Sequence, residues 1–338
     1  MSECIRTEGI KNLKVYLDSL DSMKNIENVI IVPHKNVDFD AIASAIGFSL
    51  IASKMKKNPY IVVDDNPCSI DHGVQVIMDE AKKTYPIINR DKYLQMKKDN
   101  DLIVLVDVNK KYLISLKDDI DDNSRVMIID HHDSDENTVC ADCDYIDTSM
   151  SSASEIVMKL LSIYRIKPNA CVANYLLAGI YLDTNKFTKN VTPDTMSIVT
   201  KLLECGASMN RVTDLFTEDF NSDRRVQELV SKAKITNYSV ATIVANQEDE
   251  YTREELAKAS DYLLKFGVDA AFAVGNIGDG TVAISARSKE RVNVGEIMHE
   301  LEGGGNPFSA ATKLTNTTTE EAGKRLVKTI TPSFYKTI

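Results

Sequence analysis

NVIIVPHKNVDFD, residues 28–40, joins an uninterrupted apolar run to a histidine and two aspartates. We interpret residues 27–33 as a buried strand, because a parallel strand covered on both faces is apolar throughout and does not alternate. Residues 41–54 follow at once and carry apolar side chains at three- and four-residue steps, which predicts a helix. The stretch therefore predicts the first strand and the first helix of a doubly wound α/β sheet.

The same succession of strands and helices continues over the first two thirds of the chain. Apolar runs predict strands at residues 60–63, 102–106 (LIVLV) and 126–129 (VMII). Helical spacing follows at residues 151–164, 170–182, 195–204 and 211–216. We therefore expect a parallel sheet with helices on both faces, in a domain that spans residues 1–217.

The last third of the chain predicts a smaller second domain. A polar, charged stretch leads into a helical segment, and we expect residues 218–235 to form a helical linker. The sequence NIGDG at residues 276–280 predicts a hairpin, because Asp-Gly favours a tight turn between strands. Strands are expected at 238–244, 270–277 and 281–286, and helices at 254–265, 294–301 and 318–329. Together they predict an α/β domain at residues 236–338.

Composition excludes several classes of function. Of the 338 residues 43% are hydrophobic and 27% are charged, which is typical of a globular protein and not of a disordered chain. The formal net charge of −10 disfavours long nucleic acid and anionic membranes as partners, although a bound cation could still hold a small anion. No apolar run reaches the ~20 residues that cross a bilayer. Six scattered cysteines suit a reducing compartment, so we expect a cytoplasmic protein.

Acids and histidines gather where the predicted strands end. They are His34, Asp38 and Asp40 after the first strand, Asp107 after LIVLV, and Asp130 and His131 after VMII. Any one of these acids could simply cap a helix, and Asp38 or Asp40 could cap the helix that follows them. Because the carboxyl ends of parallel strands meet at one edge, however, several carboxylates would repel one another there unless cations neutralise them. The pattern predicts a site for two metal ions whose identity stays open between manganese, iron, zinc, magnesium and calcium.

Four segments of the first domain resemble the motifs of the DHH phosphoesterase superfamily. They are HKNVDFDAIASAIG (34–47), LIVLVDVNK (102–110), IIDHHD (128–133) and LLAGIYLDTNKFT (176–188), and Asp130-His131-His132 is the triplet that gives the family its name. In the second domain, ISARS (284–288) and a triple glycine at 303–305 resemble the DHH-associated (DHHA1) domain. The segments SSASEIV (151–157) and ISARSKERVNVGEIM (284–298) are most similar to the catalytic unit of GdpP-type cyclic-di-AMP phosphodiesterases.

The resemblance implies two Mn²⁺ ions and assigns their ligands. His34 and Asp38 would bind the first ion, Asp40 and His131 would bind the second, and Asp107 would bridge both. Asp183, which the strand-end pattern does not reveal, would complete the shell. The catalytic set would be Asp107, His131, Asp130 and His132, in which Asp130 and His132 orient His131 or meet a phosphate oxygen. His132 is also a candidate proton donor to the leaving oxygen.

For the substrate, the resemblance points to the second domain. The expected contacts are Arg287, whose guanidinium suits a phosphate, with Ser285, Ser288, Gly303, Gly304, Gly305 and Asn306. The family pattern has histidine after the three glycines, whereas this chain has Asn306 followed by Pro307, so the recognition half of the site is altered. A smaller departure is Val37, where the family commonly has proline.

The expected reaction is hydrolysis of cyclic-di-AMP to linear 5′-pApA by a hydroxide that two manganese ions activate, in a cleft between the domains. One alternative is a nano-RNase or pAp phosphatase acting on short linear nucleotides. Another is a non-catalytic nucleotide sensor, which Asn306 suggests. GdpP-type proteins often carry membrane spans, a PAS domain and a degenerate cyclase-like domain, so this chain is either a standalone soluble member or an excised catalytic region. A homodimer is a possible assembly.

Overall fold

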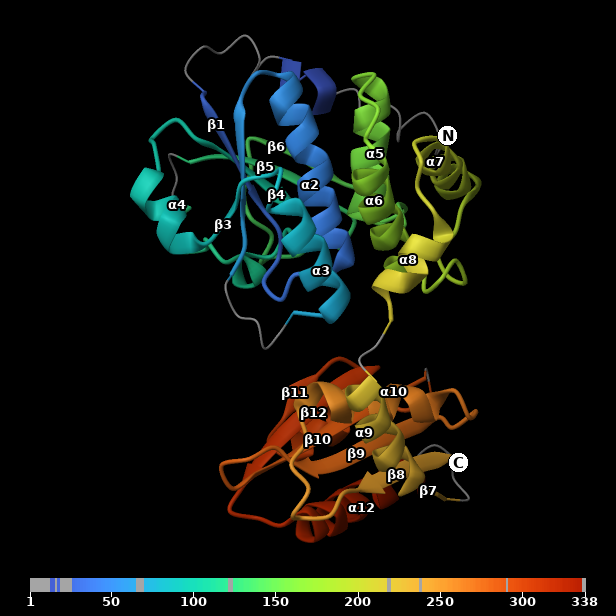
Figure 1. The fold of residues 1–338 in the computed structure, drawn as a ribbon. Coiled ribbons are helices and arrows are strands. Elements are labelled where there is room, and N and C mark those ends of the chain that lie inside the picture. The colour runs from blue at the N-terminus through green and yellow to red at the C-terminus, as the bar shows by residue number, and fades with distance from the viewer. Residues whose placement is uncertain are drawn as a thin grey trace. The chain divides into compact units, whose positions relative to one another are not determined.

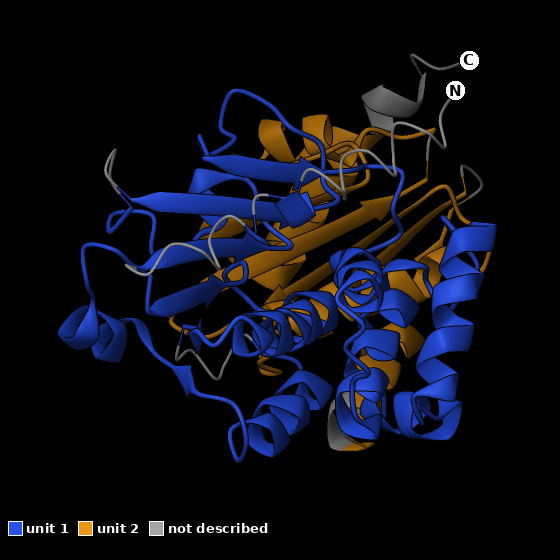
Figure 2. Ribbon diagram, turned by 90° about the horizontal axis from the view of Figure 1, so that it is seen from above, with its two compact units in different colours: residues 1–217 blue, residues 218–338 orange. Residues whose placement is uncertain are grey.

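The computed structural model describes residues 13–15, 17–18, 26–64, 70–120, 124–217, 220–236, 239–289 and 291–335. The chain forms two compact units, residues 1–217 and residues 218–338, which are coloured separately in Figure 2. Each unit has its own hydrophobic core.

The first unit is built on a sheet of six parallel strands in the order β3-β2-β1-β4-β5-β6 (Figure 1). The strands are β1 (Asn28–Val32), β2 (Asn58–Val62), β3 (Ile87–Ile88), β4 (Leu102–Val106), β5 (Arg125–Asp130) and β6 (Cys143–Ile146). In β1 and β4 every residue is buried, which is why their sequences are apolar without alternation. From β1 the strand order runs outward to β3 on one side, and from β4 it runs outward to β6 on the other, so the order changes direction between β1 and β4. The loops after these two strands therefore diverge and leave room for a site.

Helices cover both faces of this sheet, which confirms the expected α/β architecture. Its helices are α2 (Phe39–Lys54), α3 (His72–Ala81), α4 (Arg90–Met96), α5 (Ala153–Ile163), α6 (Ala170–Asp183), α7 (Pro193–Glu204) and α8 (Met209–Leu215). Val29 and Ile31 face a core shared with α2, α5 and α6. Ile30 and Val32 point to the opposite face, where Tyr93 of α4 and the segment after β4 cover them.

The second unit holds a mixed sheet in the order β11-β12-β10-β9-β8-β7. Its elements are α9 (Phe220–Ser231), β7 (Lys234–Ile235), β8 (Val240–Val244), α10 (Arg253–Leu264), β9 (Ala270–Asn276), β10 (Thr281–Ser288), α11 (Val294–Glu300), β11 (Gly304–Gly305), β12 (Ser309–Thr315) and α12 (Thr319–Tyr335). One face packs on α9 and α10, and the other packs on α11 and α12. β9 and β10 pair antiparallel around NIGDG, as the sequence predicts.

Several elements differ from those that periodicity predicts. β12 has the alternating burial of a half-exposed strand, but its sequence SAATKLT contains too few large apolar residues to signal one. α9, expected as a connecting arm, packs on α10 through Val226 and Leu229 and belongs to the second unit. Residue 238, where a strand was expected to begin, lies outside the described residues. No helix in the described ranges has the length and apolar character that crossing a bilayer requires.

Candidate metal centre

The polar residues singled out by the sequence come together at the carboxyl ends of β1, β4 and β5. His34 lies two residues beyond β1, Asp107 directly follows β4, and Asp130 is the last residue of β5. These are neighbouring strands on both sides of the point where the strand order reverses. The structure therefore gathers the predicted ligands at the edge where ligands of open α/β sheets bind.

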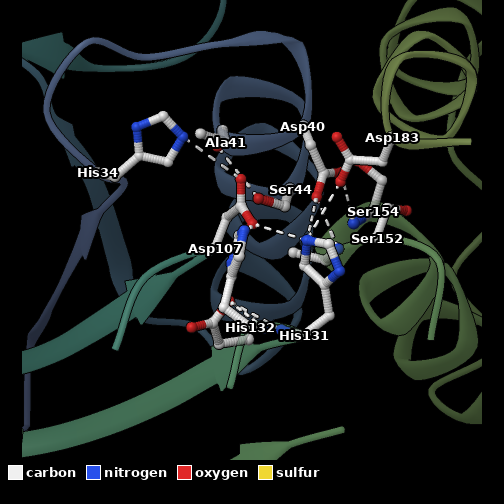
Figure 3. A network of polar contacts seen from close by, with 12 residues as sticks. His34, Asp40, Ala41, Ser44, Asp107, His131, His132, Ser152, Ser154 and Asp183 are labelled. Carbon is white, nitrogen blue, oxygen red and sulfur yellow. Dashed lines mark hydrogen bonds and ion pairs between the residues drawn. The ribbon is translucent and has the colours of Figure 1, made fainter. Parts of the chain in front are cut away.

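Asp107 lies at the middle of this cluster and is held there by an uncommon backbone conformation. Its φ of 58° falls in the left-handed region, which aspartate tolerates better than most side chains. Its amide donates to Ile129 O over 2.9 Å, so the residue stays bound to β5. Asp107 Oδ2 lies 3.5 Å from His34 Nε2, while Oδ1 lies 3.3 Å from His131 Nε2 (Figure 3). One buried carboxylate thus faces two groups of side chains, one around His34 and one around His131.

The first group contains His34, Asp38 and Asp107. His34 Nδ1 contacts the carbonyl oxygen of Lys35, which leaves Nε2 to face the two carboxylates. Asp38 Oδ2 lies 3.5 Å from that nitrogen. Its other oxygen accepts from Ala41 N over 3.0 Å and caps α2. Asp38 therefore has both of the roles that the sequence left open, helix cap and member of the acidic cluster.

The second group contains Asp40, His131 and Asp183. His131 Nε2 lies 3.1 Å from Asp183 Oδ2 and 3.9 Å from Asp40 Oδ2. Asp40 is fully buried and accepts from the first amides of α5, Ala153 N over 2.7 Å and Ser154 N over 2.8 Å. The N-terminus of α5 thereby fixes the carboxylate, and the hydrogen bond from Ser154 opposes the burial that disfavours its charged form.

Asp183 reaches the cluster because α6 crosses α2 closely. It is the last residue of α6, one turn beyond Gly179, and the glycine allows the backbone of Asp40 to approach. A Cβ at position 179 would lie 2.7 Å from Asp40 Oδ1 and 2.9 Å from Asp40 Cα. This placement depends on helix packing, which explains why strand-end reasoning did not find Asp183.

Asp130 and His132 lie beside these groups. The buried Asp130 accepts from His131 N over 2.8 Å, and its Oδ1 lies 2.9 Å from His132 Nδ1. It therefore fixes the backbone that carries His131 and orients the ring of His132. The His132 side chain is 57% exposed, with Nδ1 3.6 Å from Asp107 Oδ1. Asn109 also supports this loop, since its Nδ2 donates to His132 O over 3.2 Å. No pattern in the sequence singles out Asn109.

Burial and charge compete strongly at this site. Burial disfavours the protonated imidazoles, but the facing carboxylates outweigh it and raise the pKa of both His34 and His131 to about 11. For Asp107, burial disfavours the charged carboxylate and so acts to raise its pKa, but the two histidines outweigh burial and lower that pKa to about 2. Burial and the neighbouring carboxylates raise the pKa of Asp40 and Asp183. The acids need positive charge beside them, and the histidines supply it as protonated rings.

Divalent cations fit the cluster better than these protons do. Asp107 Oδ1 and His131 Nε2 are both buried, and neither has a hydrogen bond to any described residue. Within each group of three residues, the potential ligand atoms all lie within 4.8 Å of one another. Imidazole mixed with carboxylate suits manganese, iron or zinc. Asp107 belongs to the first group, and its Oδ1 faces His131 of the second, so the two groups could hold two such ions with Asp107 between them.

Ion binding is expected to release protons. At pH 7 the raised pKa values keep His34 and His131 protonated, whereas a metal ligand must offer a free lone pair. Mn²⁺ affinity should therefore rise as the pH rises, by about tenfold per pH unit for each proton displaced. Calorimetric titration of the metal-free protein at pH 7, in two buffers of different ionisation enthalpy, measures this release. Equal heats in both buffers would contradict it.

The second unit brings five of the predicted substrate residues to one pocket of about 620 Å³. These are Ser285, Arg287, Gly303, Gly304 and Gly305. Arg287 Nε lies 3.1 Å from Asp261 Oδ1, and its Nη1 donates to Ala286 O over 3.0 Å. Arg253 and Lys313 also line the pocket. Sequence reasoning missed both, because an isolated cation on a helix or a half-exposed strand looks like ordinary surface.

Ser288 and Asn306 are not among the residues that line this pocket. Ser288 Oγ donates to the carbonyls of Val292 and Pro307, over 2.6 and 2.8 Å. Asn306 Oδ1 accepts from Phe308 N over 2.9 Å and from Ser309 N. Both side chains therefore fix the loops around the glycines, and the oxygen of Asn306 is already used in a turn.

Comparison with known proteins finds relatives that match over most of this chain. The chain is 33% identical to the cyclic-di-AMP phosphodiesterase GdpP of Bacillus subtilis, over 91% of this chain and 48% of that protein. Five curated relatives are matched over only 36% to 48% of their own length, so the chain spans half of them or less.

Two solved structures share the fold. An exopolyphosphatase-related protein from Bacteroides fragilis superposes with a TM-score of 0.78 at 20% identity, over 98% of both chains. Exonuclease RecJ bound to manganese gives a TM-score of 0.63 at 10% identity, over 98% of this chain and 97% of that one. The N-terminal domain of the DHH family matches residues 28–180, and the DHHA1 domain matches residues 236–334. The chain therefore belongs to the DHH family and carries both of its characteristic domains.

Proposed function

We propose that this chain is a manganese-dependent phosphodiesterase that opens cyclic-di-AMP to linear 5′-pApA. The observation that carries the proposal is the position of Asp107, whose Oδ2 faces His34 of one ligand group while its Oδ1 faces His131 of the other. Two relatives from different genera are cyclic-di-AMP phosphodiesterases and align over nine tenths of this chain. We assign hydrolysis to residues 1–217 and substrate binding to residues 236–338, and residues 218–235, which include α9 on the second unit, connect the two along the chain.

Two divalent ions are the cofactor we propose, held by His34, Asp38 and Asp107 and by Asp40, His131 and Asp183. Manganese is preferred because the ligands mix imidazole with carboxylate, and because the RecJ fold neighbour binds it. Such a pair of ions would supply activation of water near neutral pH and positive charge for the phosphate oxygens. Free cysteines at the described positions suit the reducing cytoplasm, where we place this activity.

The chain's own groups position the reactants and move a proton. Asp130 raises the pKa of His132 above its ordinary value by a hydrogen bond, which favours a protonated ring near neutral pH. That ring is half-exposed beside Asp107, so it can meet a substrate from solvent. We propose that His132 gives its proton to the leaving oxygen of the scissile phosphodiester. Asp130 acts through His132 and His131 as a positioning residue.

The pocket of the second unit offers three cations and a glycine turn to an anionic ligand. Arg287, Arg253 and Lys313 line it, with Glu302 as the opposing acid. Gly303 and Gly305 leave no space for a side chain, since an added Cβ would contact the backbone of β12. Gly304 is exposed, and nothing lies within 4 Å of the position its Cβ would take, so a phosphate can approach the backbone there.

One assay separates this function from its rivals. The full chain is incubated with Mn²⁺ and equal amounts of cyclic-di-AMP, pApA and pAp, and the products are separated by chromatography. We expect cyclic-di-AMP to disappear and pApA to accumulate first. Cleavage of the linear compounds alone would make the chain a nano-RNase or pAp phosphatase. Binding without any cleavage by freshly loaded protein would make it a nucleotide sensor. Asn306→His, which restores the family residue, should leave the reaction type unchanged.

Arg287→Ala is expected to raise the KM for cyclic-di-AMP by about 10- to 100-fold, because it removes a charge-assisted contact of roughly 1.5–3 kcal/mol. The kcat should change far less, since Arg287 lies in the binding pocket and not in the metal centre. Initial rates over a range of substrate concentrations measure both values. Arg291→Ala is the matched control, because the Arg291 side chain is 81% exposed. A similar KM for both variants would remove Arg287 from the substrate site.

A further inference from the structure

A second pocket, of about 470 Å³, lies wholly within the first unit. One wall is the segment after β4, with Lys111, Ile114, Lys117 and Ile120. The opposite wall is the loop before β6, which contributes Val139 among others. The volume lies in the range of small-molecule sites. Nothing in the proposed phosphodiester chemistry uses this pocket.

The lining of this pocket combines positive charge with apolar surface. Lys111 and Lys117 both line it, and no carboxylate among the described residues forms an ion pair with either. Two acids line it among the residues that the structure describes: Asp142 accepts from Val126 N over 2.8 Å, and Glu136 is exposed. The combination suits an anion that has an apolar or planar body.

The walls of this pocket are hydrogen-bonded to the metal centre on both sides. Ile114 forms an isolated antiparallel bridge with His34, and Leu113 O accepts from Lys35 N over 2.7 Å. On the other side, Val139 N donates to Asn109 O over 2.8 Å. Asn109 Nδ2 in turn donates to His132 O over 3.2 Å. A ligand that shifts either wall would therefore move the backbone that carries His34 or His132.

We propose that this pocket is a regulatory site for a small phosphorylated metabolite of mononucleotide size, and that its occupancy changes the affinity of the metal centre for Mn²⁺. The ammonium groups of Lys111 and Lys117 bind the phosphate, and the partly exposed side chains of Ile120 and Val139 contact the planar part. Because coupling between two sites is reciprocal, Mn²⁺ changes the affinity for the metabolite by the same factor.

Binding of AMP to the full chain in EDTA tests the site apart from metal chemistry. We expect saturable binding by calorimetry that is tighter than that of inorganic phosphate or adenosine. The double variant Lys111→Gln/Lys117→Gln should bind AMP about tenfold or more weakly, since each lost charge-assisted contact contributes roughly 1.5 kcal/mol or more. Lys83→Gln/Lys201→Gln is the matched control, because it removes the same charge from exposed positions elsewhere in this unit.

Two further variants distinguish this pocket from the sites already described. AMP binding should survive both Asp107→Asn and Arg287→Ala, and its loss in either would assign AMP to the catalytic or substrate site and overturn the proposal. Undetectable binding at millimolar AMP, or equal affinity in the lysine double variant, would overturn it as well. A change of Mn²⁺ affinity on AMP saturation is expected in the wild type and not in the double variant, about fivefold or more in size. An unchanged Mn²⁺ affinity in the wild type would refute the regulatory role.

Discussion

Asp107→Asn is expected to lower the rate of cyclic-di-AMP hydrolysis by about 10³-fold or more, because it weakens both ion sites with one change. The asparagine has nearly the same shape, so the fold should persist. Its amide nitrogen cannot ligate a cation, however, and would replace either the oxygen that faces His34 or the one that faces His131. Calorimetric titration should show fewer than two Mn²⁺ ions bound, alongside the loss of activity.

Asp101→Asn is the matched control for this result. Asp101 immediately precedes β4 and Asp107 immediately follows it, so the two buried aspartates lie at opposite ends of one strand. Asp101 accepts from Asn28 Nδ2 and from Lys98 N, both over 2.9 Å. Its substitution should affect stability and leave the number of bound ions at two. If Asp107→Asn also binds two ions with unchanged affinity, the bridging role of Asp107 is wrong.

Gly179→Ala is the second variant for which we expect a large loss of rate, although Gly179 would contact neither the ions nor the substrate. Gly179→Ala would place a methyl group against Asp40 and against Ser154 Oγ, where α2, α5 and α6 meet. Asp40 must shift, and with it the carboxylate that faces His131. Since a displacement of about 1 Å in a reacting group can cost about 10²-fold in rate, we expect a loss of that order. Overpacking should also lower the free energy of unfolding by about 1–3 kcal/mol.

Gly47→Ala separates displacement of Asp40 from simple destabilisation. Gly47 lies on α2, and a Cβ there would meet Val157 Cγ1 at 2.8 Å and Leu176 Cδ2 at 3.1 Å. It overpacks the same helix junction against flexible apolar side chains. Both variants should melt at lower temperature, but only Gly179→Ala should lose Mn²⁺ at the site of Asp40. Equal ion binding and equal rates in the two variants would show that Gly179 matters only for packing.

Much of the fold could be predicted because parallel strands that are buried on both faces have continuously apolar sequences. LIVLV is apolar at every position since both of its faces are covered, and the strand it forms begins and ends where expected. β12 and the short β3 could not be predicted, because half-exposed or two-residue strands contain few large apolar side chains.

The sequence by itself determined which residues end the strands of the sheet: His34, Asp107, Asp130 and His131. It could do so because parallel strands bring their carboxyl ends to one edge whatever else the chain does. Only the tertiary structure decided how they face one another. The left-handed φ of Asp107 directs its oxygens to two histidines, and the close crossing of α2 and α6 at Gly179 brings Asp183 opposite His131. Backbone dihedrals and helix crossings arise from packing between distant segments, which no local pattern of residues records.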